Sequence, residues 1–147
     1  MKVVFLDIDG VLVSFASMHL PNEILPLSMQ PVDAFDEKCV GRLKNILDKT
    51  GAKIVLTSSW RKLFDIAEMI EHFKNHGIVG IIDCTASLND HRGKEIQLWL
   101  DENKVDKFVI LDDDDDMLHL SSDLVKTNWK LGLEDNDMEL AIEMLNG

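Results

Sequence analysis

Short runs of apolar and β-branched residues recur along this chain, and they constrain its fold more than any other feature. Five such runs occupy residues 2–8, 52–57, 77–82, 107–111 and 123–127. The first four are apolar almost throughout and do not alternate between apolar and polar residues. A strand with that pattern is covered on both faces, as in a parallel sheet. We therefore expect a mainly parallel, five-stranded sheet at the centre of the protein.

Helical patterns fill the intervals between these runs. Leu43, Ile46 and Leu47 share one face of a segment from about residue 36 to 50, which Gly51 would end. The same spacing recurs at Leu63, Ala67 and Ile70, at Ile96, Trp99 and Leu100, and at Met138, Ala141, Ile142 and Leu145. Strands that alternate with helices predict a three-layer, doubly wound α/β fold with helices on both faces of the sheet.

Length and composition are those of one ordinary globular domain, with 147 residues of which 46% are hydrophobic and 29% charged. The formal net charge of −12 argues against a surface that binds nucleic acid without specificity, and leaves nucleic acid only as a possible substrate. No apolar run approaches the roughly 20 residues of a membrane span, and no signal-peptide cleavage site is visible. We expect a cytoplasmic protein with no membrane partner. The oligomeric state stays open.

One segment, residues 14–34, breaks the rhythm of strands and helices. It contains all three prolines of the chain and shows no regular period. It is too short to be a second domain, and long irregular loops inside compact domains are often functional. We predict a flap or loop insertion after the first strand, within a single domain that spans residues 1–147 and has no cap or a minimal one.

Polar residues follow the predicted strands at the point where each one ends. Asp7 and Asp9 follow the first run, Thr57 and Ser58 the second, and Asp112 to Asp116 the fourth, while Arg92 and Lys94 open the third predicted helix. Ligands of an open α/β sheet bind beyond the carboxyl ends of its strands. If these strands are neighbours, two acidic clusters, a hydroxyl cluster and a cation converge on one crevice.

A crevice of this composition has a specific chemistry. Several carboxylates held together repel one another unless a cation neutralises them, and oxygen ligands suit Mg²⁺. Hydroxyls and backbone N–H groups accept phosphate oxygens from a substrate. A carboxylate held there can attack phosphorus, and a second carboxylate two residues further along an extended chain projects to the same side to move the leaving-group proton.

Four motifs in chain order resemble those of the haloacid dehalogenase (HAD) superfamily. They are DIDGV at 7–11, a strand ending in TSS at 57–59, a basic residue at a helix start, and a strand ending in DD at 112–113. The combination FLDIDGVL, LTSSWR, RGKEIQLWL and VILDDDDDM is similar to the HAD domain of bacterial "Swiss army knife" RNA-repair proteins and their stand-alone relatives. The resemblance covers about residues 2 to 130 and implies a HAD-like Rossmannoid fold.

The resemblance also implies roles for the residues of the first two motifs. Asp7 matches the nucleophile, which is also a Mg²⁺ ligand. Asp9 matches the general acid/base and would bind the metal through its backbone carbonyl. Thr57 matches the phosphate-binding hydroxyl, with Ser58 and Gly10 nearby. Arg61 would pair with a phosphate, or would be an ordinary surface arginine.

For the remaining two motifs the resemblance implies a cation and a pair of metal ligands. Arg92 fits the family spacing of the cation slightly better than Lys94, and both stay open. Asp112 matches the metal ligand and Asp113 its partner. Asp116 is the alternative partner or caps the next turn, while Asp114 and Asp115 are predicted to be solvated surface.

The function implied is a Mg²⁺-dependent phosphohydrolase that cleaves phosphomonoesters through an aspartyl-phosphate. A nucleotide, a polynucleotide end or a small metabolite would be the phosphorylated substrate, and a small-metabolite phosphatase is one alternative reading. The other alternative is a non-catalytic HAD-like domain that binds phosphorylated ligands or a protein. The Asp7 and Asp9 pair favours an enzyme, because a binding domain has no need of a proton shuttle.

Overall fold

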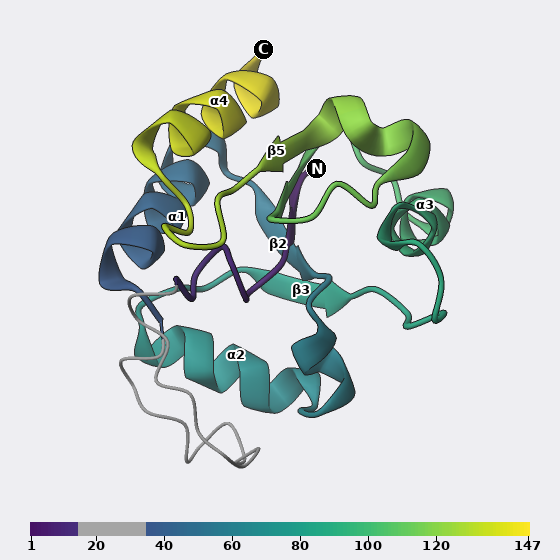
Figure 1. The fold of residues 1–147 in the computed structure, drawn as a ribbon, viewed down its shortest axis with the longest axis horizontal. Helices are drawn as coiled ribbons and strands as arrows, with labels where there is room; N and C mark the ends of the chain where they lie inside the picture. Colours follow the sequence, from purple (N-terminus) through teal and green to yellow (C-terminus); the bar gives the residue numbers. More distant parts are fainter. Residues whose placement is uncertain (15–34) are drawn as a thin grey trace.

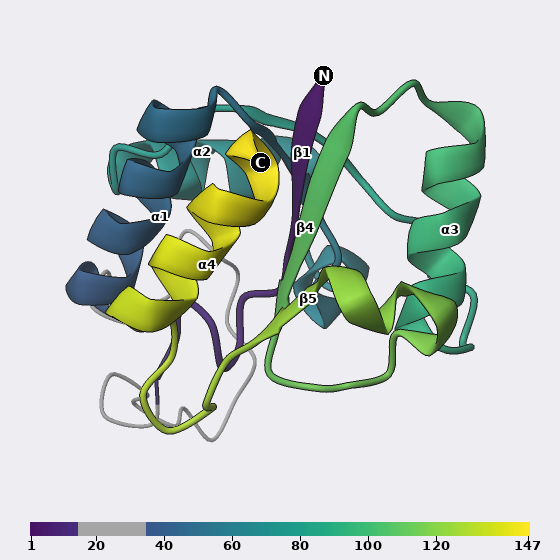
Figure 2. The ribbon, with the colours of Figure 1, turned by 90° about the horizontal axis from the view of Figure 1, so that it is seen from above.

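A parallel sheet with helices on both faces forms the protein (Figures 1 and 2). The computed structural model describes residues 1–14 and 35–147. In these ranges the strands are β1 (Lys2–Leu6), β2 (Lys53–Leu56), β3 (Ile81–Cys84), β4 (Lys107–Asp112) and β5 (Leu124–Lys126). Their order is β3-β2-β1-β4-β5 and every neighbouring pair is parallel. The predicted three-layer, doubly wound α/β class is confirmed.

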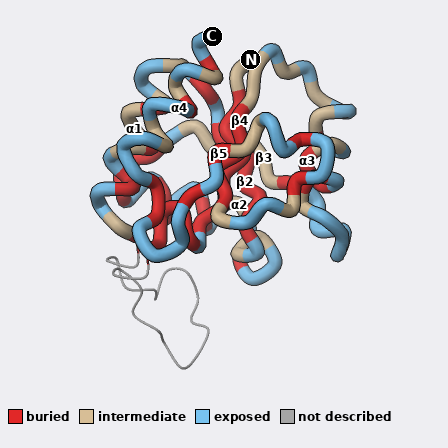
Figure 3. Tube along the Cα trace, turned by 45° about the horizontal axis from the view of Figure 1, so that its top comes forward, coloured by how far each residue is buried: buried red, intermediate tan, exposed pale blue. Residues whose placement is uncertain are grey.

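The helices divide unequally between the two faces. α1 (Glu37–Thr50), α2 (Ile66–Asn75) and α4 (Asp135–Asn146) lie on one side of the sheet, and α3 (Arg92–Glu102) lies on the other, as Figure 2 shows. Two short 3₁₀ helices, η3 (Ser59–Lys62) and η4 (Leu118–Asp123), follow β2 and precede β5. The sheet is therefore enclosed between layers, and its strands form the buried centre seen in Figure 3.

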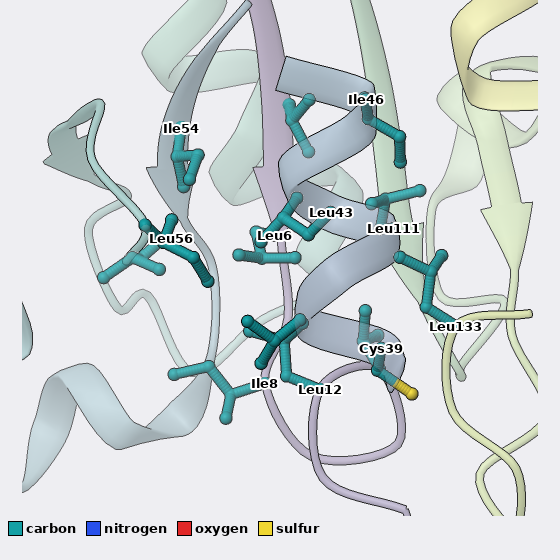
Figure 4. Close-up of a cluster of buried hydrophobic side chains, with 14 of the residues drawn as sticks. Leu6, Ile8, Leu12, Cys39, Leu43, Ile46, Ile54, Leu56, Leu111 and Leu133 are labelled. Carbon is teal, nitrogen blue, oxygen red and sulfur yellow. The ribbon is translucent and has the colours of Figure 1, made fainter. Parts of the chain in front are cut away.

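The apolar runs are continuous because both faces of each central strand are buried. In β1, Val4 and Leu6 pack into the cluster beneath α1, whereas Val3 and Phe5 pack into the cluster beneath α3. Figure 4 shows the α1 side, where Leu43 and Ile46 of the helix lie over the strands. The central strands are thus held firmly, and the residues that follow them have fixed starting points.

The helical face expected from Leu63 and Ile70 is wrong. Both side chains are exposed, at 54% and 39%, whereas Met69 and Phe73 of α2 are buried. The chain first forms η3, and α2 begins only after Asp65, whose carboxylate accepts a hydrogen bond of 2.8 Å from Glu68 N. That later start shifts the buried face of the helix by several residues.

The third apolar run forms its strand later than the expected range of 77–82. Gly77 and Gly80 have φ of +78° and +113°, which bends the chain there, and β3 begins at Ile81. The strand then runs through the polar Asp83, whose carboxylate accepts a 2.7 Å hydrogen bond from the indole of Trp99. A buried partner on α3 thus holds a charged residue in a strand.

The flap predicted at 14–34 lies outside the described residues, apart from Ser14. The Ser14 hydroxyl donates to Asp36, the residue that caps the start of α1, over 3.0 Å. In the described ranges, no helix is both long and apolar enough to cross a membrane.

Candidate active site

The ends of β1 and β4 bring three carboxylates together. Leu6 pairs with Leu111 across these adjacent strands, so Asp7 and Asp112 emerge side by side. Asp7 is 6% exposed and Asp112 is completely buried. Asp7, Asp112 and Asp113 each offer an oxygen within 4.8 Å of the others. This cluster comes from two segments that are about a hundred residues apart, and the parallel register of the sheet creates it.

Arg92, the first residue of α3, reaches into this cluster. Its Nη1 lies 2.7 Å from Asp112 Oδ2 and 3.2 Å from Asp7 Oδ1. Lys94 instead pairs with Asp90 over 3.0 Å, and its side chain is 64% exposed. The structure therefore brings Arg92 and not Lys94 to the carboxylates, which favours Arg92 among the two candidates for the cation.

The carboxylates of the cluster are poorly compensated. Burial raises the pKa of Asp7 to about 8, repulsion from Asp112 adds to the rise, and the Arg92 guanidinium opposes it. The pKa of Asp113 is also raised, mainly by burial and then by its interactions with Asp112. One arginine against three acids leaves a deficit of positive charge, and the ligand atoms are all oxygen. This donor set fits a hard divalent cation such as Mg²⁺.

Asp9 lies outside the three-carboxylate cluster and has a different partner. The indole N–H of Trp60 donates to Asp9 Oδ2 over 3.0 Å. Burial raises the pKa of Asp9, and this hydrogen bond opposes the rise. Trp60 directly follows the TSS motif in the sequence, but its bond to Asp9 was not predictable from that position.

Gly10 permits the close approach of Asp113. Its φ is +80°, and a Cβ at this position would lie 2.5 Å from Asp113 Cγ. Its carbonyl accepts a 2.7 Å hydrogen bond from the buried Thr127 hydroxyl. The structure therefore gives Gly10 a packing role beside the acidic cluster, which its predicted phosphate-binding role does not require.

Thr57 carries a hydroxyl that has no hydrogen-bond partner among the described residues. It follows β2, where its backbone N–H donates to Leu6 O over 2.9 Å, next to the start of the Asp7 loop. Its side chain is fully buried, and its Oγ1 has no hydrogen-bond partner in the described part of the chain. A buried unpaired hydroxyl is uncommon and calls for a ligand or water. The neighbouring Ser58 hydroxyl accepts from Trp60 N over 3.2 Å and caps η3.

A polar hollow of about 230 Å³ opens over the cluster. Asp7, Asp112, Asp113 and Arg92 line it, together with the rim residues Lys62 and Asn89. Arg61 lines it too, but its guanidinium is 2.8 Å from Glu95 and donates to the carbonyls of Thr57 and Ser58. The Arg61 side chain is thus only 5% exposed, and Arg61 is not an ordinary surface arginine.

The rest of the acidic run serves other purposes. The Asp116 carboxylate bonds His91 Nδ1 and accepts from Arg92 N over 3.3 Å, and its carbonyl accepts from Gly93 N over 3.0 Å. Asp116 therefore caps the start of α3 and is not part of the three-carboxylate cluster. Asp115 is exposed and lies 3.9 Å from Lys126 Nζ.

A parallel α/β sheet with this acidic cluster at the carboxyl ends of its strands has the form of a HAD-like domain. The sequence matches the family described as the HAD domain in Swiss Army Knife RNA repair proteins over residues 3–138, and the chain belongs to that family. No curated protein and no solved structure gives a significant match. Membership supports a HAD-type phosphohydrolase in general terms and confirms the resemblance found in the sequence.

Proposed function

We propose that this protein is a Mg²⁺-dependent phosphohydrolase that cleaves phosphomonoesters through an aspartyl-phosphate on Asp7. One observation carries the proposal. Asp7, Asp112 and Asp113 converge within 4.8 Å of one another, and Arg92 lies between the first two. A nucleophile beside a cation site and a fixed arginine is the arrangement that phosphoryl transfer requires.

The carboxylates of Asp7, Asp112 and Asp113 would hold the metal, together with the Asp9 backbone carbonyl that the family resemblance implies. When bound, Mg²⁺ supplies the positive charge that keeps Asp7 ionised at neutral pH and offsets the charge of the phosphate. Without a cation, the pKa of Asp7 near 8 leaves this carboxyl mostly protonated and a poor nucleophile.

In the first step an Asp7 carboxylate oxygen attacks phosphorus and forms the aspartyl-phosphate. The bond from phosphorus to the substrate oxygen breaks, and the protonated Asp9 carboxyl gives its proton to that oxygen. Arg92 and the unpaired Thr57 hydroxyl are the donors available to the phosphoryl oxygens.

In the second step Asp9, now ionised, takes a proton from water as the water oxygen attacks phosphorus. The bond between phosphorus and Asp7 breaks, and inorganic phosphate leaves with Asp7 restored. The 3.0 Å hydrogen bond from Trp60 fixes where the Asp9 carboxylate points during both proton transfers.

The substrate class in this proposal is a phosphomonoester on a nucleotide, a polynucleotide end or a small metabolite. The family description names RNA repair proteins, which favours nucleic-acid ends, whereas the net charge of −12 repels long polynucleotides. Initial rates on a 3′- or 5′-phosphorylated oligonucleotide and on the matching mononucleotide would decide. Faster turnover of the mononucleotide would exclude the polynucleotide as the preferred substrate.

Hydrolysis of a generic aryl phosphate, with Mg²⁺ and with EDTA, tests the reaction itself. We expect turnover only with Mg²⁺, and we expect Asp7→Asn to reduce kcat by at least about 10³-fold because the nucleophile is lost. Asp48→Asn, which alters an exposed aspartate on α1, is the matched control and should behave as wild type. Equal activity in EDTA, or an active Asp7→Asn variant, would refute the mechanism.

A further inference from the structure

Arg61 of η3 and Glu95 of α3 form a deeply buried ion pair beside the candidate site. Arg61 Nη2 lies 2.8 Å from Glu95 Oε1, and the side chains are 5% and 6% exposed. Removing two charges from water costs several kcal/mol per ion in general, and the pairing energy often does no more than offset this cost. Stability alone is therefore a poor explanation for the pair.

The Arg61 guanidinium also forms hydrogen bonds to the backbone near Thr57, whose hydroxyl is the candidate phosphate-binding group. Its Nη1 donates to the Ser58 carbonyl over 2.7 Å and to the Thr57 carbonyl as well. These bonds fix two successive peptides of the loop that follows β2. The planar, multidentate guanidinium suits this task, which a lysine ammonium cannot reproduce with the same geometry.

Glu95 connects this loop to two further segments. Its second carboxylate oxygen accepts a 2.7 Å hydrogen bond from Leu88 N, in the loop that follows β3. Its own helix, α3, presents Arg92 to the acidic cluster three residues earlier. Among the described residues, no hydrogen bond joins Thr57 or Ser58 directly to Arg92. The Arg61–Glu95 pair therefore provides a polar connection between α3 and the loop that follows β2.

We propose that Arg61 and Glu95 are positioning residues, which hold the Thr57–Ser58 loop at the correct distance from Arg92 so that both contact the same phosphoryl group. This inference rests on the proposed phosphohydrolase function. Asp7 and the Thr57 N–H are held by the sheet, but the peptides that follow Thr57 lie in a loop and Arg92 lies on a helix, and the strands alone do not fix the relative position of these two. A displacement of about 1 Å in such a contact can reduce turnover about 100-fold.

Two variants separate positioning from stability. Arg61→Lys keeps the positive charge opposite Glu95 but removes the guanidinium that donates hydrogen bonds to the Thr57 and Ser58 carbonyls. The double variant Arg61→Met with Glu95→Leu replaces the buried pair by apolar side chains of similar volume, a change that is often neutral or stabilising. Arg42→Lys is the control, because Arg42 likewise joins a carboxylate, Asp135, to a backbone carbonyl, but away from the hollow.

We expect Arg61→Lys to lose about 10- to 100-fold in kcat/KM on an aryl phosphate and to be inhibited more weakly by inorganic phosphate. The double variant should lose as much when assayed well below its Tm, which should fall modestly because the Leu88 N–H and the Thr57 and Ser58 carbonyls lose their partners. Arg42→Lys should match wild type in all three measurements. If Arg61→Lys and the folded double variant keep kcat/KM and phosphate inhibition within twofold of wild type, the inference is overturned. If the double variant does not fold, Arg61→Lys alone decides.

Calorimetric binding of inorganic phosphate in Mg²⁺ distinguishes this inference from the proposed function. If wild type binds phosphate but turns over no phosphomonoester, the proposed hydrolase is refuted, and the inference survives only if Arg61→Lys weakens phosphate binding. If wild type turns over substrate and Arg61→Lys does so equally well, only the inference is refuted. Wild type that neither turns over substrate nor binds phosphate would refute both.

Discussion

Two members of the five-aspartate run at residues 112–116, Asp112 at its start and Asp115 near its end, have the same side-chain chemistry and opposite surroundings. Asp112 is completely buried and bonded to Arg92 over 2.7 Å. Asp115, three residues later, is exposed and only loosely paired with Lys126 at 3.9 Å. Charge density along the sequence is uniform across the run, whereas the free-energy consequences of each charge are not.

The difference between Asp112 and Asp115 arises because β4 ends at Asp112. Asp112 is the last residue of the strand, and the chain turns immediately, with Asp114 N donating to Asp112 Oδ1 over 3.0 Å. Asp114 and Asp115, beyond this turn, are exposed to water and salt, which screen their interactions, whereas Asp112 is buried beside Asp7 and Arg92, where screening is weaker. A strand end thus selects which aspartates of a uniform run are able to act on a ligand.

Of the substitutions that test this comparison, replacing Asp112 should have the largest effect, and it should act on the Mg²⁺ dependence of activity. Asp112→Asn keeps the shape of the side chain but removes a charge from the cluster, so we expect the Mg²⁺ concentration for half-maximal activity to rise more than about tenfold. A Mg²⁺ titration of aryl phosphate turnover measures this. The same titration with Asp115→Asn should superimpose on that of wild type. Equal shifts in the two variants would show that Asp112 and Asp115 do not differ in their effect on Mg²⁺ binding.

Asp7, which lies beside Asp112 in the cluster, should make the stability of the protein depend on pH. Because the folded-state pKa of Asp7 is raised to about 8 from 3.8, the folded state holds a proton that the unfolded chain has lost. The contribution of Asp7 to the free energy of unfolding is therefore fully present below pH 3.8 and is lost as the pH rises toward 8. The free energy of unfolding falls by up to about 1.4 kcal/mol per pH unit in this range.

Urea unfolding in EDTA between pH 5 and 8.5, for wild type and Asp7→Asn, measures this loss as the difference between the two free energies of unfolding. Mg²⁺ should remove most of the pH dependence, because a bound cation favours the ionised carboxylate. A wild-type slope in EDTA equal to that of Asp7→Asn would show that Asp7 titrates as an ordinary surface carboxylate.

A smaller effect is expected at Trp60. Trp60→Phe keeps an aromatic ring beside Phe35 and Phe64 but removes the N–H that donates to Asp9. We expect kcat to fall about 5- to 13-fold with little change in KM, since one hydrogen bond contributes about 1 to 1.5 kcal/mol. Steady-state kinetics on an aryl phosphate tests this, and a change confined to KM would assign Trp60 to substrate binding instead.

The sequence predicted the layers, the strand positions of β1, β2, β4 and β5, and the grouping of Asp7 with Asp112, because each follows from patterns local to one segment. Apolar runs report burial on both faces, and parallel strands place their ends at one edge. The sequence also left Arg92 and Lys94 as alternatives. Their positions on α3 differ by two residues, and only the direction of the side chain from the first helical turn separates them.

The misses have two physical causes, local turns and caps in the first two cases and tertiary contact in the third. Leu63 looked like part of a helix face, but η3 and the Asp65 cap displaced α2 along the chain. The run at 77–82 looked like a strand until Gly80 turned it at φ +113°. The partnership of Arg61 with Glu95 joins residues from separate segments, and no local pattern in the sequence encodes which buried acid an arginine will meet.

The smallest effect on activity and stability is expected for replacement of Asp115, near the exposed end of the run. Asp115→Ala removes an exposed charge that is 3.9 Å from Lys126, and exposed pairs contribute about 0 to 1 kcal/mol. We expect kcat/KM and Mg²⁺ half-saturation within twofold of wild type and a free energy of unfolding within about 0.5 kcal/mol. Activity and urea unfolding at low and high salt measure both. A loss of Mg²⁺ affinity comparable to that of Asp112→Asn would mean that the acidic rim, and not the end of β4, gathers the cation.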